Sequence, residues 1–165
     1  MDYNVTFSSL PVSLEELKAL PMADLKKPEH TAALAVAALC VYPKDREAAL
    51  AMLDYLRGPR PLSVMEKQFI NDRFMDGKDY IPRSYFTGAS PQNNYQPEVP
   101  YSIRMSDSHA TVAEEGYSIL DLYSGGADSA RTVTLRLKPS TGQWFLWEMA
   151  LLAGIREPAE KDPWA

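Results

Sequence analysis

The chain has 165 residues, a charged fraction of 24% and a formal net charge of −5. This length and composition predict one globular domain, 1–165, able to bury a core of its own. The negative charge argues against nucleic acid or an anionic membrane as the main partner. The single cysteine, Cys40, rules out an internal disulfide and favours a cytoplasmic protein. No stretch resembles a signal peptide or a transmembrane helix.

The first part of the chain, 1–79, has the pattern of packed helices. Ser13 and Glu16 fit a capping box, and the short helix that they open must end before Pro21. Residues 31–42 (TAALAVAALCVY) are apolar on almost every side of a helix, which predicts a central buried helix. Cys40 falls inside this helix and is interpreted as a small core residue, with a reactive thiol as the alternative.

Two further helices are predicted between 45 and 77. Asp45 is a suitable N-cap, and the apolar residues of 49–56 recur at helical spacing until Gly58 and the proline after it. Ser63 and Glu66 form a second capping-box pattern, and Gly77 follows at the expected end of that helix.

Residues 80–100 (YIPRSYFTGASPQNNYQPEVP) have too many prolines for a regular element. A loop of this length in a compact domain is usually functional, and its aromatic residues argue against disorder. The sequence therefore predicts a binding surface made of loop residues Tyr85, Phe86, Asn93, Asn94 and Tyr95. A loop packed as a lid over one face of a sheet is an equally open interpretation.

Residues 101–150 are predicted to form an antiparallel sheet of about four strands. Apolar and polar residues alternate through 131–138, a Pro and Gly turn follows, and 143–147 (QWFLW) is apolar on both faces. Such a strand is expected to be covered on both faces. Its aromatic residues Trp144, Phe145 and Trp147 are expected mostly in the core, with the lining of a ligand pocket as the alternative. In the tail, 151–165, Trp164 is expected to dock on the domain. Helices followed by strands define an α+β class.

The segment 124–129 (SGGADS) matches the SGGxDS phosphate loop of ATP pyrophosphatases. An anion would lie against the backbone near Ser124, Gly125, Gly126 and Ser129. That loop requires a helix directly after it, whereas the next residues alternate as a strand does. The segment is therefore interpreted as a turn between strands, with an anion-binding backbone nest as the remaining alternative.

No spacing typical of a metal site or catalytic motif is present. His109 lies near Asp107, Glu114 and Glu115, but turn chemistry accounts for this group, and His30 is expected at a solvated helix start. The sequence thus predicts no catalytic residue, no metal and no cofactor, and favours a protein that is not an enzyme.

Several long segments resemble a bacterial domain family of unknown function. These segments are TAALAVAALCVYP, GPRPLS, YIPRSYFTGASPQNNYQPEVPY, SGGADSARTVTLR and STGQWFLWE with LLAGIREPAEKDPWA. The resemblance implies a single small bacterial domain and carries no activity. At the level of fold alone, helices followed by a curved sheet are similar to NTF2-like cone proteins.

Three functional hypotheses follow from the sequence. The leading one is a non-catalytic binding or assembly domain, whose partner is another protein or a second copy of the chain. The second is a small-ligand or enzymatic pocket between helices and sheet. The third is nucleotide or anion binding at Ser124 to Ser129.

Overall fold

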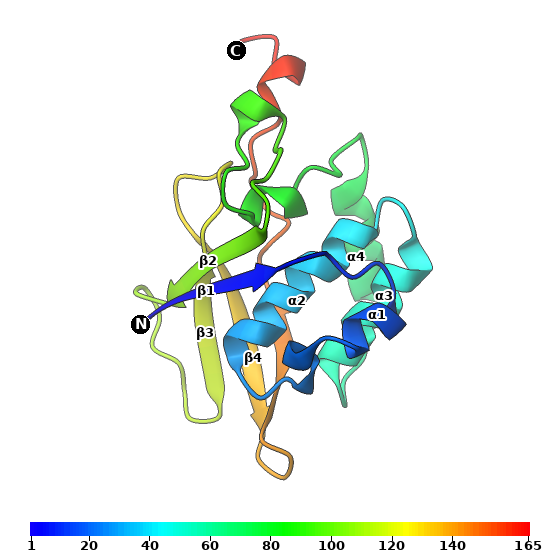
Figure 1. Cartoon of the computed structure of the whole chain (residues 1–165), viewed down its shortest axis with the longest axis vertical. Coiled ribbons are helices and arrows are strands. Elements are labelled where there is room, and N and C mark those ends of the chain that lie inside the picture. The colour runs from blue at the N-terminus through cyan, green and yellow to red at the C-terminus, as the bar shows by residue number, and fades with distance from the viewer.

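The computed structural model describes all residues, 1–165, and has the predicted α+β architecture (Figure 1). Its α-helices are α1 (Leu14–Lys18), α2 (Pro28–Val41), α3 (Arg46–Arg57) and α4 (Val64–Phe74). Its strands are β1 (Asp2–Phe7), β2 (Tyr101–Asp107), β3 (Tyr117–Leu122), β4 (Arg131–Lys138) and β5 (Gln143–Met149). No helix combines the length and the apolar character needed to cross a membrane.

The strands form one antiparallel sheet in the order β1-β2-β3-β4-β5, which is one strand more than the sequence predicted. The additional strand is β1, which pairs along its whole length with β2, so that Val5 lies opposite Ile103. Its residues alternate between polar and apolar, and Val5 and Phe7 are buried on the inner face. The sequence carries this period-two pattern at the N-terminus, although no strand was predicted there.

The alanine-rich helix α2 is the centre of the core, as predicted. Residues 31–39 are all buried, because the inner face of the sheet covers one side and α3 another. Figure 1 shows α2 lying directly against the sheet, with the remaining helices farther out. Its small side chains allow neighbouring elements to approach closely on all sides.

The predicted caps are present at the helix starts. The Ser13 and Asp45 side chains accept hydrogen bonds from the backbone of the first turns of α1 and α3. Ser63 and Glu66 form a complete capping box at α4, with both reciprocal bonds. Gly58 ends α3 with a φ of +62°, a conformation that favours glycine.

The segment 80–100 and the chain after β5 pack together at one end of the molecule (Figure 1). Leu151 and Leu152 are buried, and the hydroxyl of Tyr85 donates to the carbonyl of Leu151. The predicted docking of Trp164 is wrong, because this side chain is 92% exposed. The apolar residues at 151–155, rather than the tryptophan, hold the tail on the domain.

Strand β5 is an edge strand, and its two faces are covered differently from the prediction. Its inner face packs on α2, and Leu146 is buried there. No helix covers the outer face. Instead the α3–α4 loop lies on Phe145, so closely that a Cβ at Gly58 would be 2.4 Å from the ring. This contact explains why a glycine is needed at the end of α3, in addition to its positive φ.

Candidate functional site

A β-bulge in β5 sets the position of Trp147. Thr134 pairs with Glu148 and Leu135 pairs with Leu146, so Trp147 is the extra residue between them. A bulge releases the backbone groups of the extra residue from the ladder. Because Leu146 faces the core, the ring of the next residue, Trp147, lies on the outer face of the sheet, where it meets Tyr117 of β3 and Arg136 of β4.

Side chains and a loop occupy the outward backbone groups of β5. The N–H of Trp144 donates to the carbonyl of Leu25 at 2.7 Å, and Thr31 Oγ1 donates to the carbonyl of Trp144 at 2.6 Å. The carbonyl of Trp147 accepts from Arg57 Nη1 at 3.3 Å and from Arg60 Nη2 at 3.0 Å. These bonds occupy both outward groups of Trp144 and the carbonyl of Trp147, which makes this edge less available for pairing with a strand of another chain.

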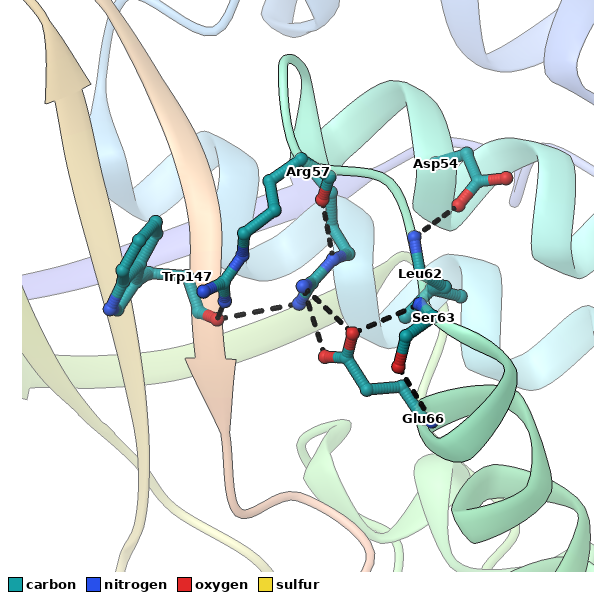
Figure 2. A network of polar contacts seen from close by, with 7 residues as sticks. Asp54, Arg57, Leu62, Ser63, Glu66 and Trp147 are labelled. Carbon is teal, nitrogen blue, oxygen red and sulfur yellow. Dashed lines mark hydrogen bonds and ion pairs between the residues drawn. The ribbon is translucent and has the colours of Figure 1, made fainter.

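Arg57 is the centre of a polar network that joins α3, α4 and β5 (Figure 2). It is only 5% exposed, and its Nη2 lies 2.9 Å from Glu66 Oε2. Its Nε donates to the carbonyl of Arg60 at 3.0 Å, while Glu66 also accepts from the N–H of Ser63. A buried guanidinium needs such a set of acceptors, because an unpaired charge in the interior is very costly.

A second bond in Figure 2 stabilises the same loop. Asp54 Oδ1 accepts from the N–H of Leu62 at 2.9 Å, which fixes the chain just before α4. Together with the Arg57 contacts, this bond gives the α3–α4 loop one conformation. Arg60, which lies in that loop, is therefore held over β5 by a rigid support.

Both members of the Arg57–Glu66 pair remain charged at neutral pH. Burial lowers the pKa of Arg57, and the Glu66 carboxylate opposes this effect, but a guanidinium stays protonated in either case. Burial alone would raise the pKa of Glu66. The Ser63 N–H and the Arg57 charge outweigh it and leave this pKa below its ordinary value. Neither group is suited to exchange protons near neutral pH.

Two guanidinium groups stack on the Trp147 ring. The Arg60 group lies 3.7 Å from the ring centre and the Arg136 group 4.6 Å from it. Arginine stacks on indole because its planar, weakly hydrated cation is attracted to the π-face. This arrangement, called here the Trp147 stack (Arg60, Trp147, Arg136), holds two cations on the outer face.

Two hollows meet at the Trp147 stack. The first, the α4 groove, has a volume of about 440 Å³ and lies between α4 and the end of β5. The second, the β4 pocket, has a volume of about 390 Å³ and lies over the turn between β4 and β5. The hollows share Arg57, Arg60 and Trp147.

The α4 groove is mainly apolar, and apolar side chains continue beyond it. Its lining includes Leu62, Met65, Phe69 and Met149. Met65 is 83% exposed and Phe69 50% exposed, and neighbouring Val64 is also exposed. Large apolar side chains that gather beside a groove are typical of a protein-interaction site.

Of the loop residues predicted to form a binding surface, three are in the core. Tyr95 is 0% exposed, and Tyr85 and Phe86 are also buried. The Tyr95 ring stacks on Tyr80, and its hydroxyl donates to the carbonyl of Arg156. Burial raises the pKa of Tyr95 to about 12, so this hydroxyl stays a donor. These three rings therefore belong to the core and do not form an exposed aromatic patch on the loop.

The two asparagines of the same loop are exposed, but they shape the backbone. Asn93 Oδ1 accepts from the N–H groups of Ser90 and Gln96, and its Nδ2 donates to the carbonyl of Gly88. Asn94 has a φ of +56°, which asparagine tolerates better than most residues. The structure thus does not bring the five predicted residues together on one surface.

The SGGADS segment lies against the 80–100 segment and the tail. The Gly125 N–H donates to the carbonyl of Ser84, and the Gly126 N–H donates to Ser124 Oγ. A Cβ at Gly125 would be 1.9 Å from the carbonyl oxygen of Ala89. Close packing between segments therefore accounts for both glycines, and their N–H groups already have partners.

The segment's continuation also differs from that of a phosphate loop. Ser129 accepts from Arg131, and β4 begins at Arg131 where a phosphate loop would continue into a helix. Elsewhere, no group of three or more histidine, cysteine, aspartate or glutamate residues is arranged to hold a metal. The exposed His109 instead donates its backbone N–H to Asp121.

Comparison with known families identifies the family of the chain. The model of DUF6935, a domain of unknown function, matches residues 9–159. The chain belongs to this family. No curated protein and no solved structure matches it. The DUF6935 match confirms the resemblance to an uncharacterised domain family, whereas the looser similarity to NTF2-like cones stays a prediction.

The sequence pattern does not indicate the Trp147 stack. It predicts the helix end at Gly58 without singling out Arg57 or Arg60, and it favours a core position for Trp147 over the lining of a ligand pocket. A signal was present: Arg136 lies on the polar side of an alternating strand, directly before a turn to a strand that is apolar on both faces. The bulge that frees the Trp147 carbonyl to accept from Arg57 and Arg60 has no such signature in the sequence.

Proposed function

We propose that this DUF6935 domain is a non-catalytic, cytoplasmic binding domain of bacteria that takes a segment of a protein partner in the α4 groove. The main support is the set of exposed apolar side chains, Val64, Met65 and Phe69, beside a groove that ends at Trp147. Aromatic and arginine side chains are enriched at the centres of protein interfaces. The unbridged Cys40 supports a reducing compartment.

A binding role fits the chemistry of the groove better than catalysis does. Its titratable groups include Arg57 and Glu66, which are paired and stay charged at neutral pH. A general acid or base needs a pKa near the working pH. The rigid support of Arg60 and Trp147 favours recognition, since a preformed surface loses little freedom on binding.

Site-specific photo-crosslinking tests this proposal. A photoreactive phenylalanine analogue is placed at position 65, and a matched variant carries it at position 112, where Val112 is 94% exposed and far from the groove in the sequence. In the cells that make the protein, we expect position 65 to give a discrete adduct with one other protein. Equal adducts from both positions, or an adduct only with a second copy of this chain, would contradict a heterologous partner at the groove.

A second candidate function is supported by a separate cleft. It has a volume of about 600 Å³ and lies between the β1–α1 loop, α2 and the 80–100 segment. Cys40, Phe86 and Tyr101 contribute its apolar wall, and Arg83 and Asp79 lie at its polar side. This mixture of apolar and polar groups is typical of small-molecule sites. Burial raises the pKa of Cys40 to about 12, so its thiol would serve as wall and not as nucleophile.

Cys40 provides the test for this second candidate, because it is the only cysteine. A ligand in the cleft would slow alkylation of Cys40 by a small maleimide. We would screen carboxylate-bearing aromatic compounds at 1 mM and compare alkylation of the native protein with that of the urea-unfolded chain. A ligand of the cleft should slow the alkylation of Cys40 in the native protein and have no such effect in the unfolded chain. If no compound slows alkylation more in the native protein than in the unfolded chain, a small-ligand role for the cleft has no support.

A further inference from the structure

The charge of the β4 pocket differs from that of the rest of the molecule. Among its nine lining residues are four basic ones and no acidic one, although the chain carries a net charge of −5. The basic residues are Arg57, Arg60, Arg136 and Lys138. The three ion pairs of the chain use only one of these four, Arg57. The other three cations have no carboxylate within ion-pair distance.

Strand geometry places these cations around one hollow. Arg136 and Lys138 are two residues apart on β4, so both side chains project from the outer face of the sheet. Arg60 approaches from the other side, on the loop that the Arg57 network fixes. Like charges repel at this spacing, and stacking on Trp147 offsets only part of that cost. An anion between them would remove the repulsion and bind to all three.

The walls of the pocket indicate what kind of anion fits. Phe145 and Trp147 form an apolar base, and Pro59 and Pro139 are rigid residues at its sides. A guanidinium binds a carboxylate through two parallel hydrogen bonds, and most donors of Arg60 and Arg136 have no partner within the chain. Because the pocket meets the α4 groove at Trp147, one extended segment can enter both hollows.

We infer that the β4 pocket binds carboxylate side chains of an acidic protein segment whose apolar neighbours enter the α4 groove. This inference rests on the proposed function and specifies the chemistry of its partner. The apolar groove provides contact area, and the β4 pocket provides selection by charge. The partner segment thus carries glutamate or aspartate next to an aliphatic or aromatic residue.

Two short peptides test the inference directly. The probe is acetyl-Glu-Glu-Leu-Glu-Glu-amide, and the matched control replaces every glutamate with glutamine and keeps the leucine. Binding is followed by NMR through the indole N–H signals of the three tryptophans, with Trp147→Phe identifying the signal of Trp147. We expect the acidic peptide to shift the Trp147 signal and leave that of exposed Trp164 unchanged. Affinity should fall as salt rises, because exposed charges are screened beyond about 8 Å at physiological ionic strength.

A charge-reversal variant provides the specificity control. Arg136→Glu with Lys138→Glu should weaken binding of the acidic peptide about tenfold or more, since two cations that attract its carboxylates become anions that repel them. Lys44→Glu with Lys78→Glu changes the net charge equally at exposed positions outside the pocket, and should have little effect. Neither pair has a side-chain ion pair to lose.

The outcomes separate the inference from the proposed function. Equal shifts from the glutamine peptide, or tighter binding of inorganic phosphate or a single-stranded oligonucleotide, would overturn the acidic-segment inference. In that case an adduct from position 65 would still support a protein partner at the α4 groove. A response to the acidic peptide without that adduct would keep the anion site and remove the proposed function.

Discussion

Two aromatic regions of this domain lie opposite to what their sequences predict: the one predicted at the surface is buried, and the one predicted in the core has an aromatic ring on the outer face of the sheet. The segment 80–100 has the composition of a surface loop, yet Tyr85, Phe86 and Tyr95 are buried. Strand β5 has the composition of a core strand, yet Trp147 lies on the outer face in contact with two arginines. The difference shows that polar partners distant in sequence help to decide where a tyrosine or tryptophan lies. The buried tyrosines have carbonyl acceptors, and the partly buried tryptophan has stacked cations.

A pair of alanine variants has the largest expected effect on stability and tests the contrast between the two regions. Tyr95→Ala removes a fully buried ring that stacks on Tyr80, and should lower the free energy of unfolding by about 3–5 kcal/mol. Trp147→Ala removes a half-exposed ring and leaves its carbonyl in place for Arg57, and should cost only about 1–2 kcal/mol. Urea unfolding measures both values.

Tyr95→Phe is the control for this pair. It keeps the ring and removes only the hydroxyl that donates to Arg156, so the loss should be about 0.5–1.5 kcal/mol. If Trp147→Ala proved as destabilising as Tyr95→Ala, the outer face of β5 would be part of the core and the contrast between the two regions would disappear.

A second variant examines how the Trp147 region is supported. Arg57→Ala removes the bonds that hold the α3–α4 loop to β5 and leaves Glu66 without its cation. We expect a loss of about 2–3 kcal/mol, the range for charged hydrogen bonds in a partly buried setting. Arg60→Ala loses a stacked, exposed cation and one of the two donors to the Trp147 carbonyl, and should cost about 0.5–1 kcal/mol by the same urea measurement, because Arg57 remains as a donor. Equal losses from the two variants would mean that the network is not what fixes this loop.

A third variant concerns the glycines that pack against the buried loop. Gly125→Ala places a Cβ 1.9 Å from the Ala89 carbonyl oxygen, and should destabilise the protein by about 1–3 kcal/mol because the backbone must shift. Gly116→Ala has no atom within 4 Å of its new Cβ, so it should cost only the strain of its positive φ, about 1 kcal/mol.

Differential scanning fluorimetry with ATP completes this test. A phosphate loop at Ser124–Ser129 would give a thermal shift with millimolar ATP, and Gly125→Ala would abolish it. We expect no shift in either protein, since the N–H groups of Gly125 and Gly126 already donate within the chain. A reproducible ATP shift in the native protein would return this segment to consideration as a nucleotide site.

Local patterns predicted the regular elements well, and contacts distant in sequence account for what they missed. The caps at Ser13, Asp45 and Ser63 and the buried helix α2 follow from residues close together in the chain. The candidate site does not. The acceptors for the Tyr85 and Tyr95 hydroxyls lie 66 and 61 residues away, and Arg57 reaches a carbonyl 90 residues away. No periodicity within 11–18 residues can indicate such partners.

The smallest expected effect is the dependence of stability on pH through Glu66. Its folded pKa lies below the unfolded value, so the unfolded chain binds more protons in acid and stability falls as pH decreases. The contribution of Glu66 is complete above the ordinary carboxyl pKa of about 4.3, and it is lost as pH falls through the lower folded pKa. The magnitude should stay below about 1 kcal/mol, because the Glu66 side chain is 40% exposed.

Glu66→Gln isolates this contribution from those of the other carboxyl groups. Glutamine can still accept from the Ser63 N–H, so the capping bond is kept while the charge opposite Arg57 is removed. The free energies of unfolding of the two proteins, measured in urea between pH 7 and pH 3, should differ most at neutral pH and converge in acid. Parallel curves would mean that the Arg57 charge does not stabilise the Glu66 carboxylate. The conformation of the loop that carries Arg60 would then depend on the bond from Leu62 to Asp54 and on the donation from Arg57 to the Arg60 carbonyl.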